Sequence, residues 1–436
     1  MENALKMAPT VPVYEEDGET FGGPVGGMSD RQNPLREMYQ NRDNALKIWR
    51  VFGNAFVDVK PLKGLVLRSN FGLDYYHSFI HSMTHTFKSD IVNNDIPSTT
   101  LGTNDDVRWT WSNTANYNFD IATDHHFTVL AGMELHKQTK EESSAYAQSF
   151  DLEDKDYMWP DAATGIRRSS GIGSGYTLAS FFGKVDYNWQ DLLLASFTIR
   201  RDGSSRFGRN NRWGTFPSVS LAWRASEEEW FPKNNILNDL KIRAGYGVTG
   251  SQASVGNYSY LASYNTSVYP FGKTGTEQSA LVSATLANPN IHWEQVAQTN
   301  IGFDAALFNQ RAHLTFDYYI KNTTDMLVKA SIPITSGFED TSTTYTNAGK
   351  VRNTGFEVSL NTVNIQGPLR WETGIVYTYN RNKIKSLNSD VPYYINQVNN
   401  SYVTMLANNL PINVFYGYVT DGIFQNELEV KEHAIQ

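Results

Sequence analysis

Histidines in two short clusters are the residues of this chain whose spacing could support metal or acid–base chemistry. His81 and His85 are four residues apart, the spacing of two zinc ligands on one helical turn. They follow a stretch with strand periodicity and lack the glutamate of a zinc protease motif, so we interpret them as structural histidines in a loop. His125–His126 lies at a predicted short turn and has the same interpretation. The sequence therefore predicts no catalytic residue, no metal site and no enzyme activity.

Other patterns that serve catalysis or cofactor binding are incomplete. The glycine-rich stretch Gly171–Gly175 has no following helix or lysine, so it predicts a flexible loop and no cofactor site. The chain has no cysteine, which excludes disulfides, thiolate zinc sites and cysteine nucleophiles. It carries 37 basic and 45 acidic side chains, a formal net charge of −8. Nucleic acid is therefore not expected as a partner.

Strict alternation of apolar and polar residues is the dominant pattern, and it predicts β-strands. In residues 107–119 the odd-numbered positions are mostly apolar and the even-numbered positions are polar. The same period recurs at 65–77, 126–136, 311–321 and 370–380. We count about twelve such segments, each near the ~9–11 residues with which a tilted strand crosses a bilayer. The polar residues expected to face a water-filled lumen are Arg108, Thr110, Asn116, Asp317 and Lys321.

Connections between these segments alternate in length. The short ones are 61–64, 121–124, 190–191, 309–310 and 366–368. The long ones are about 78–106, 139–175, 250–290 and 384–411. Outer-membrane barrels have tight periplasmic turns and long extracellular loops. The sequence therefore predicts an all-β fold, an antiparallel transmembrane β-barrel wall.

A soluble antiparallel sandwich also alternates, and it stays open as an alternative at this point. Two features favour the barrel. Aromatic residues gather near strand ends, as in interfacial girdles; they include Trp109, Trp111, Tyr117 and Phe119. Loops of about 25 residues are uncommon in compact sandwiches.

The sharpest local sequence contains R-R-D-G-S-S-R-F-G at 200–208 and W-G-T-F-P-S-V-S-L-A-W-R at 213–224. Gly203 is predicted to take a positive φ in a tight turn. Pro217 lacks an N–H, so a bulge or irregularity is expected there. Ser226, with Glu229 three residues later, predicts a capped helical turn.

Further motifs follow in order: N-P-N-I-H-W-E at 288–294, D-Y-Y-I-K-N-T-T-D-M-L at 317–327, N-A-G-K-V-R-N-T-G-F-E at 347–357 and G-Y-V-T-D-G-I-F at 417–424. Together the motifs resemble the SusC/RagA family of TonB-linked outer-membrane proteins over about residues 180–424. The motif residues we single out as turn and strand positions are Arg201, Asp202, Gly203, Ser204, Ser205, Arg206, Phe207, Gly208, Phe216, Pro217, Ser218, Trp293 and Glu294.

The resemblance implies a TonB-dependent importer in the bacterial outer membrane, surrounded by its lipid. Its cargo would be large nutrients, glycans or peptides, and its partners a SusD-like surface lipoprotein and TonB, reached through an N-terminal region. The family's signal peptide, plug domain and terminal strands are not found. The resemblance thus predicts an irregular segment over 1–45 and a partial barrel over 46–436.

Two other functions stay open at this point. One is a non-transporting surface protein that binds carbohydrate or acts as an adhesin. The other is an outer-membrane hydrolase, which would need acidic residues and histidines converging at the barrel mouth. Loop aromatics would suit stacking on sugar rings; they are Tyr157, Trp159, Tyr258, Tyr260 and Tyr264.

Overall fold

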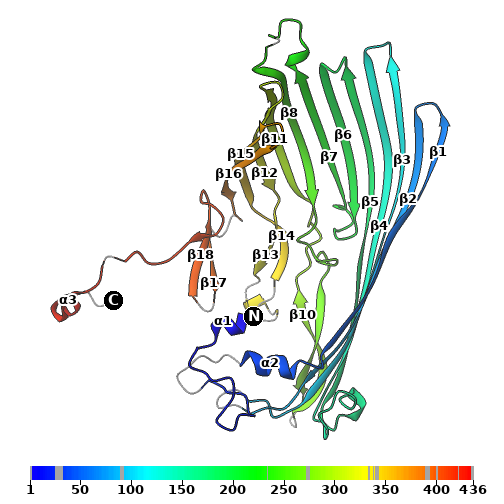
Figure 1. Cartoon of the computed structure of the whole chain (residues 1–436). Coiled ribbons are helices and arrows are strands. Elements are labelled where there is room, and N and C mark those ends of the chain that lie inside the picture. The colour runs from blue at the N-terminus through cyan, green and yellow to red at the C-terminus, as the bar shows by residue number, and fades with distance from the viewer. Residues whose placement is uncertain are drawn as a thin grey trace. The chain divides into compact units, whose positions relative to one another are not determined.

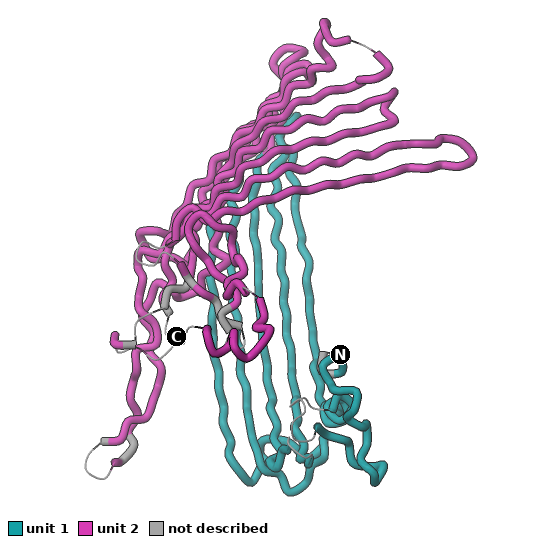
Figure 2. Tube along the Cα trace, turned by 90° about the vertical axis from the view of Figure 1, so that its left-hand side faces the viewer, with its two compact units in different colours: residues 1–115, 132–181 teal, residues 116–131, 182–436 magenta. Residues whose placement is uncertain are grey.

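The computed structural model describes residues 2–24, 33–88, 93–232, 234–271, 275–331, 334–336, 338, 343–387, 393–398, 401–420 and 422–433. Almost all regular structure in them is β-strand (Figure 1). The chain divides into two compact units, residues 1–115 with 132–181 and residues 116–131 with 182–436 (Figure 2). Asp421 of the last motif lies outside the described residues.

Twelve strands form the main sheet, in the order β1-β2-β3-β4-β5-β6-β7-β8-β11-β12-β15-β16. Their bounds are β1 (Ala45–Leu62), β2 (Leu65–Thr84), β3 (Ser98–Ile121), β4 (His125–Gln148), β5 (Arg167–Trp189), β6 (Leu193–Ser204), β7 (Trp213–Arg224), β8 (Leu237–Ser251), β11 (Glu294–Leu307), β12 (Ala312–Thr324), β15 (Lys350–Ile365) and β16 (Trp371–Ser386). Strands that follow one another in the chain are mostly sheet neighbours, as in a meander. The predicted all-β antiparallel wall of about twelve strands is confirmed.

Strand length is the main difference from the prediction. β2, β3, β4 and β5 have 20, 24, 24 and 23 residues. They extend into stretches predicted as long loops, and Gly171–Gly175 lies inside β5. The backbone ladder needs no apolar side chain, and polar pairs support it here: the Ser144 and Ser170 hydroxyls are 2.8 Å apart. Polar composition therefore misidentified these strand ends as loops.

Three small sheets occupy the other long connections. They are β9 (Ser263–Phe271) with β10 (Thr276–Thr285), β13 (Leu327–Ser331) with β14 (Thr343–Asn347), and β17 (Tyr393–Val398) with β18 (Ser401–Ala407) and β19 (Val414–Phe415). The short connections are as predicted, with strands ending and restarting around 63–64, 122–124, 190–192, 308–311 and 366–370. Gly64 has a φ of 85°, the left-handed conformation that favours glycine.

Helices are few and short. They are α1 (Glu2–Lys6), α2 (Pro34–Gln40) and α3 (Glu427–Glu432), with 3₁₀ turns η1 (Pro160–Ala162), η2 (Ala225–Glu227) and η3 (Ile334–Ser336). α1 and α2 lie in the segment predicted to be irregular. The helical turn near Ser226 exists as η2, but the predicted cap is wrong, because Ser226 Oγ donates to Asp239 instead. None of the helices in the described part of the chain has the length and apolar character to cross a membrane.

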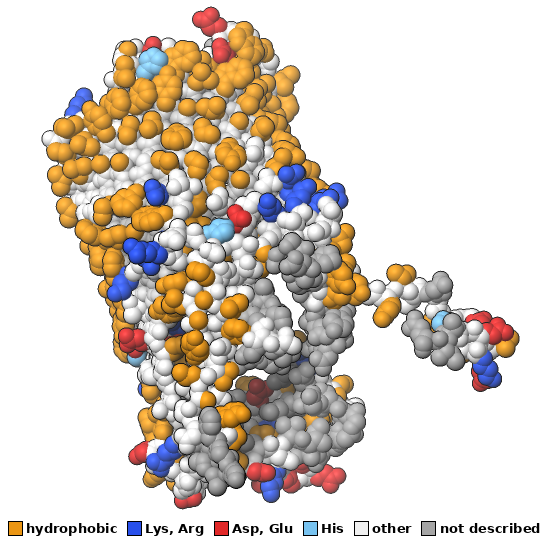
Figure 3. All heavy atoms as spheres, turned by 180° about the vertical axis from the view of Figure 1, so that it is seen from behind, with side chains coloured by type: hydrophobic (Ala, Val, Ile, Leu, Met, Phe, Trp, Pro, Cys, Tyr) orange, Lys and Arg blue, Asp and Glu red, His pale blue; other side chains and the backbone are white. Residues whose placement is uncertain are grey.

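Register separates two faces of the sheet in the second unit. Ile242, Phe303, Phe316, Val358 and Tyr377 lie directly opposite one another on β8, β11, β12, β15 and β16. The rings of Phe303 and Phe316 stack at 5.7 Å. In Figure 3, hydrophobic side chains gather across the strands in the upper part of the view. One face of these strands is therefore continuously apolar.

The next row points to the opposite face. It consists of Arg243, Gly302, Asp317, Glu357 and Thr378, again directly opposite one another. Apolar and polar rows alternate because successive side chains of a strand point to opposite faces. The three largest fully buried side chains, Phe207, Met158 and Ile291, lie in connections between strands, and the next largest, Ile384, lies in β16. The bulkiest buried side chains of the described residues are thus found mainly in the connections.

Candidate functional site

The polar face of the second unit centres on Arg243 of β8. Its Nε donates to Asp304 Oδ2 of β11 at 2.8 Å, and its Nη2 donates to Asp317 Oδ2 of β12 at 3.1 Å. Asp317 is two strands away, so its carboxylate reaches across β11. It can do so because residue 302 is glycine: a Cβ there would lie 2.4 Å from Asp317 Oδ1. The three charged side chains are 20–40% exposed, so the array faces an open surface.

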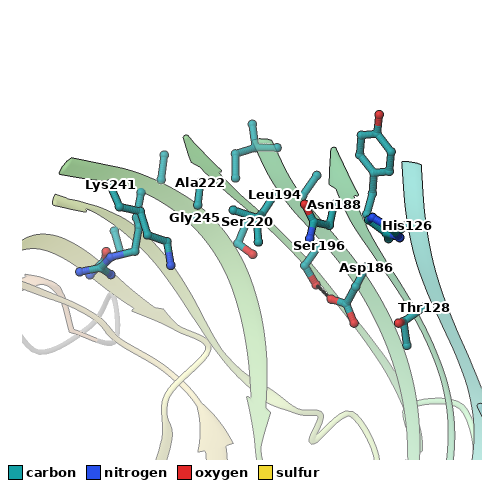
Figure 4. A pocket seen from close by; sticks show the side chains of 16 residues that line it. His126, Thr128, Asp186, Asn188, Leu194, Ser196, Ser220, Ala222, Lys241 and Gly245 are labelled. Carbon is teal, nitrogen blue, oxygen red and sulfur yellow. Dashed lines mark hydrogen bonds between the residues drawn. The ribbon is translucent and has the colours of Figure 1, made fainter. Parts of the chain in front are cut away.

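A hollow of about 560 Å³ with a mixed polar and apolar lining adjoins this array and extends from β4 to β11. Figure 4 shows side chains that line it. They include His126, Thr128, Asp186, Asn188, Ser196, Ser220, Lys241, Arg243 and Asn300. Hydroxyls, amides and charges of both signs suit contact with water and polar ligands. Ser196 Oγ donates to Asp186 Oδ1 at 2.7 Å, whereas His126 Nδ1 lies 2.6 Å from Asp120. Serine and histidine are therefore engaged separately, and the hollow has the chemistry of a binding surface.

The predicted lumen-facing residues are distributed along the strands. In the first unit, Arg108 Nε donates to Asp106 Oδ1 at 3.1 Å, and Thr110 Oγ1 is 2.9 Å from His136 Nδ1. Even-numbered positions of β3 and β4 thus share one face.

In the second unit, Asp317 binds Arg243, and Lys321 lies opposite Gln298 and Asn353 in a polar row. Asn116 lies on β3 and is partly exposed. The structure brings Asp317 into the charged array and places the other four elsewhere on the strands.

Aromatic side chains lie on the other side of β3. Trp109 stacks on Phe71 of β2 with ring centres 6.2 Å apart. Trp111 Nε1 donates to Ser69 Oγ at 3.0 Å. Nearer the 122–124 turn, stacked rings join Tyr117 to Phe119 at 5.1 Å and Phe119 to Phe127 at 5.3 Å. This belt of aromatic rings at a strand end has the composition of an interfacial girdle.

The motif residues form a second feature, a packed cluster of connections that we call the motif cluster: Phe207, Phe216, Ile291 and Trp293 with Gly250. Phe207 is 0% exposed, and its ring lies 5.0 Å from that of Trp293. Phe216 meets Trp293 edge-on at 5.6 Å. A Cβ on Gly250 would lie 2.1 Å from Phe216 Cζ, so only glycine fits beneath this ring.

Hydrogen bonds link the connections at 205–212, 252–262 and 286–293 to one another and to the neighbouring strand ends. Trp293 Nε1 donates to the Arg212 carbonyl at 2.8 Å. Arg206 Nε donates to Asn257 Oδ1 at 3.0 Å, and its Nη1 donates to the Gln252 carbonyl at 3.1 Å. Other contacts are Ser204 Oγ to Gln252, Asn211 to the Pro289 carbonyl, and Leu327 N to Glu294 Oε2. Ser205 and Gly208 lie in the same turn, and a Cβ on Gly208 would meet the Pro289 carbonyl. The cluster fastens connections together.

The turn predicted at Gly203 and the bulge predicted at Pro217 are both wrong. Gly203 has no positive φ; it lies in β6 opposite Trp213, whose indole would be 2.8 Å from a Cβ there. Glycine is therefore required by ring packing. Pro217 pairs with Ile199 without a register shift, so no bulge is needed against β6. Pairing of β7 with β8 begins at Ser218, which leaves the missing N–H of Pro217 outside that ladder.

Arg201, Asp202 and Phe216 are strand residues of the motif. Asp202 accepts a hydrogen bond from Arg200 Nε at 2.8 Å. The Arg201 guanidinium lies 5.5 Å from the Trp213 ring centre.

The first histidine of the 81/85 pair is placed differently from the prediction, whereas His85 follows β2 in a connection, as predicted. His81 lies in β2, not in a loop, and is 7% exposed. Its Nε2 is 3.1 Å from Thr99 Oγ1 and 3.2 Å from the Met158 carbonyl. Within the described residues, no three His, Cys, Asp or Glu side chains converge on a possible metal position. The sequence analysis did not predict the Arg243 array. The signal that could have indicated it was a charged residue on each of three predicted strands, at a position expected to point to the polar face.

Comparisons with known proteins agree on one family. The sequence model described as TonB dependent receptor-like, beta-barrel matches residues 14–427. TonB-dependent receptor P26 of Formosa agariphila is 29% identical, covering 100% of this chain and 44% of that protein. TonB-dependent receptor SusC of Bacteroides thetaiotaomicron is 35% identical over 58% of this chain and 26% of SusC.

Solved structures show the same architecture. The RagAB peptide importer in its closed-closed state superimposes with a TM-score of 0.78 at 25% identity. That match covers 92% of this chain and 43% of the RagAB chain. The present chain therefore spans less than half the length of these two receptors and of the RagAB chain.

Proposed function

We propose, since the chain belongs to the TonB-dependent receptor-like β-barrel family, that it forms part of the wall of an outer-membrane importer for large nutrients. The chain is an outer-membrane protein by family and by fold. The family consists of transporters and receptors, and we assign no catalytic role to any residue of this chain.

The observation that carries the proposal is the segregation of two faces by register. The row through Ile242 and Tyr377 is apolar, as a lipid-facing surface requires. The row through Arg243 and Glu357 is charged and polar, as a water-filled passage requires. A soluble sandwich would instead pack the apolar row against a second sheet.

We assign lumen-facing roles to Arg108, Thr110, Asn116, Asp317 and Lys321, together with the Arg243 array. Asp317 and Lys321 lie on the same side of β12 because they are four residues apart in a strand. Charges of both signs, hydroxyls and amides in the hollow would let a polar polymer pass by exchanging hydrogen bonds. This composition is compatible with glycans and with peptides.

The similar proteins suggest the cargo and partners. RagAB is a peptide importer, and SusC is a TonB-dependent receptor. By analogy we propose that glycans or peptides are the cargo, that a SusD-like surface lipoprotein assists, and that TonB supplies energy through a plug-bearing region of the whole protein.

Uptake by cells that make the whole outer-membrane protein tests the proposal. A fluorescent malto-oligosaccharide and a fluorescent oligopeptide serve as probes, each with and without a protonophore that abolishes TonB energisation. We expect periplasmic accumulation of at least one probe that the protonophore stops. Surface binding without energy-dependent entry would refute import and favour a carbohydrate-binding or adhesin function. Affinity purification from the source outer membrane tests the partner: a SusD-like lipoprotein should co-purify.

A further inference from the structure

The first unit contains a buried cationic side chain without a hydrogen-bond partner. Arg36 of α2 is 2% exposed. Its Nε, Nη1 and Nη2 are all buried, and none donates a hydrogen bond to a residue that the structure describes. The guanidinium carbon lies 4.2 Å from the centre of the Phe87 ring, a contact of cation–π type. The face of the Phe87 ring does not provide hydrogen-bond acceptors for the N–H groups of the planar guanidinium.

This arrangement is costly for the protein alone. A guanidinium keeps its charge in proteins, and a buried charge is normally paired and hydrogen-bonded. Burial lowers the pKa of Arg36, and the neighbouring Glu37 carboxylate acts in the opposite direction. A buried polar group with no partner in a folded protein calls for an explanation, and a bound ion or ligand is one.

Local structure holds Arg36 in this position. The Asn33 side chain, itself only 4% exposed, caps α2 by accepting from Leu35 N at 3.0 Å. The amide of Asn33 also donates to the Val13 carbonyl at 3.0 Å and the Gly22 carbonyl at 2.9 Å. The start of α2 is thus tied to the N-terminal segment. The position of Arg36 is therefore fixed by the hydrogen bonds that Asn33 makes at the start of α2.

A second buried nitrogen lies nearby in the chain. His85, two residues before Phe87, has a side chain that is 9% exposed. Its Nδ1 faces Glu153 Oε2 at 3.5 Å, and its Nε2 is buried with no hydrogen-bond partner among the described residues.

We infer that Arg36 binds an oxyanion, a carboxylate or a phosphate, through its paired N–H groups. The planar guanidinium fork matches two oxygens of either group bidentately. The oxyanion has two possible sources: a free small ion, or a carboxylate carried by another segment of the longer protein. This site does not depend on the proposed import function.

Thermal melting of the detergent-purified chain tests the inference, with acetate or inorganic phosphate compared with chloride at equal ionic strength. We expect acetate or phosphate to raise the melting temperature and selenate to give an anomalous peak at Arg36 in crystals. Arg36→Met should raise the melting temperature without anion, because it removes an uncompensated charge. The same variant should lose the response to anions. Arg36→Gln should weaken anion binding by about 10- to 150-fold, the loss of one charge-assisted hydrogen bond.

Arg42→Met is the matched control. Arg42 is exposed, lies 3.5 Å from Asp43 and packs on Tyr39, so its loss should leave the anion response unchanged. If the whole outer-membrane protein shows the same anion response as this chain, the source is a free oxyanion. A response confined to this chain would instead identify a carboxylate of another segment. No anion response in either protein, or an Arg36→Met chain that responds as the parent does, would overturn the inference.

Discussion

Phe207→Ala is expected to open the motif cluster without unfolding the sheet. Phe207 is completely buried, and its ring packs at 5.0 Å against Trp293. Removing a buried phenylalanine costs about 3–5 kcal/mol, and a lost aromatic pair moves the value toward the upper end. The 205–212 turn is attached to the rest of the unit largely through this cluster, so most of the loss should appear as local opening.

Limited trypsin digestion in detergent measures that opening, because the turn contains Arg206, Arg209 and Arg212. A protease cleaves the transiently opened form, so its rate follows the opening equilibrium when closing is fast. A loss of 3–5 kcal/mol raises the open population by roughly 150- to 5,000-fold, up to full opening. Cleavage in this turn should accelerate by that factor, while cleavage elsewhere stays unchanged.

Phe308→Ala is the control for this prediction. Phe308 lies in the 308–311 turn of the same unit and is 54% exposed. Its truncation should change trypsin cleavage by less than ~3-fold, the effect of a surface substitution. Equal rates in the Phe207→Ala variant and the parent chain would show that the cluster does not hold the turn, and the packing argument would be wrong.

Three further predictions concern the glycines and the two faces. Gly250→Ala should destabilise the cluster by at least ~1 kcal/mol in a urea melt, because its Cβ would lie 2.1 Å from Phe216 Cζ, whereas Gly53→Ala, with nothing within 4 Å, should not. Val358→Arg should cost about 2–4 kcal/mol in lipid vesicles and Ser359→Arg under ~1 kcal/mol, and equal costs would refute the face assignment. Without detergent the chain should sediment as aggregate, because residues such as Tyr377 (56% exposed) and Leu221 (57% exposed) form an uncovered apolar face. A detergent-free monomer with a cooperative melt would contradict this.

The sequence alone determined which residues share a face. Side chains alternate with a period of two along any strand, so Phe316 and Asp317 must point to opposite sides whatever the strand pairs with. The tight turn at Gly64 could also be predicted from the sequence, because a turn depends on only three or four consecutive residues. Motif order also identified the family, since it requires no spatial information.

Tertiary structure decided what the motif residues touch. Gly203 was predicted as a turn glycine, but the structure requires glycine there, and at Gly250, because an aromatic ring from another strand lies against the position. The lengths of β3 and β4 were hidden for a related reason: ladder hydrogen bonds come from the partner strand and leave no mark on composition.

The Arg243 array depended on the same long-range information. Arg243 and Asp317 are 74 residues apart and meet only because β9 and β10 leave the main sheet, so β11 pairs with β8. Arg36 and Phe87 likewise come together through folding of separate segments. Alternation is a local property that every strand carries, whereas charge pairing and ring packing depend on which distant strand or connection arrives beside it.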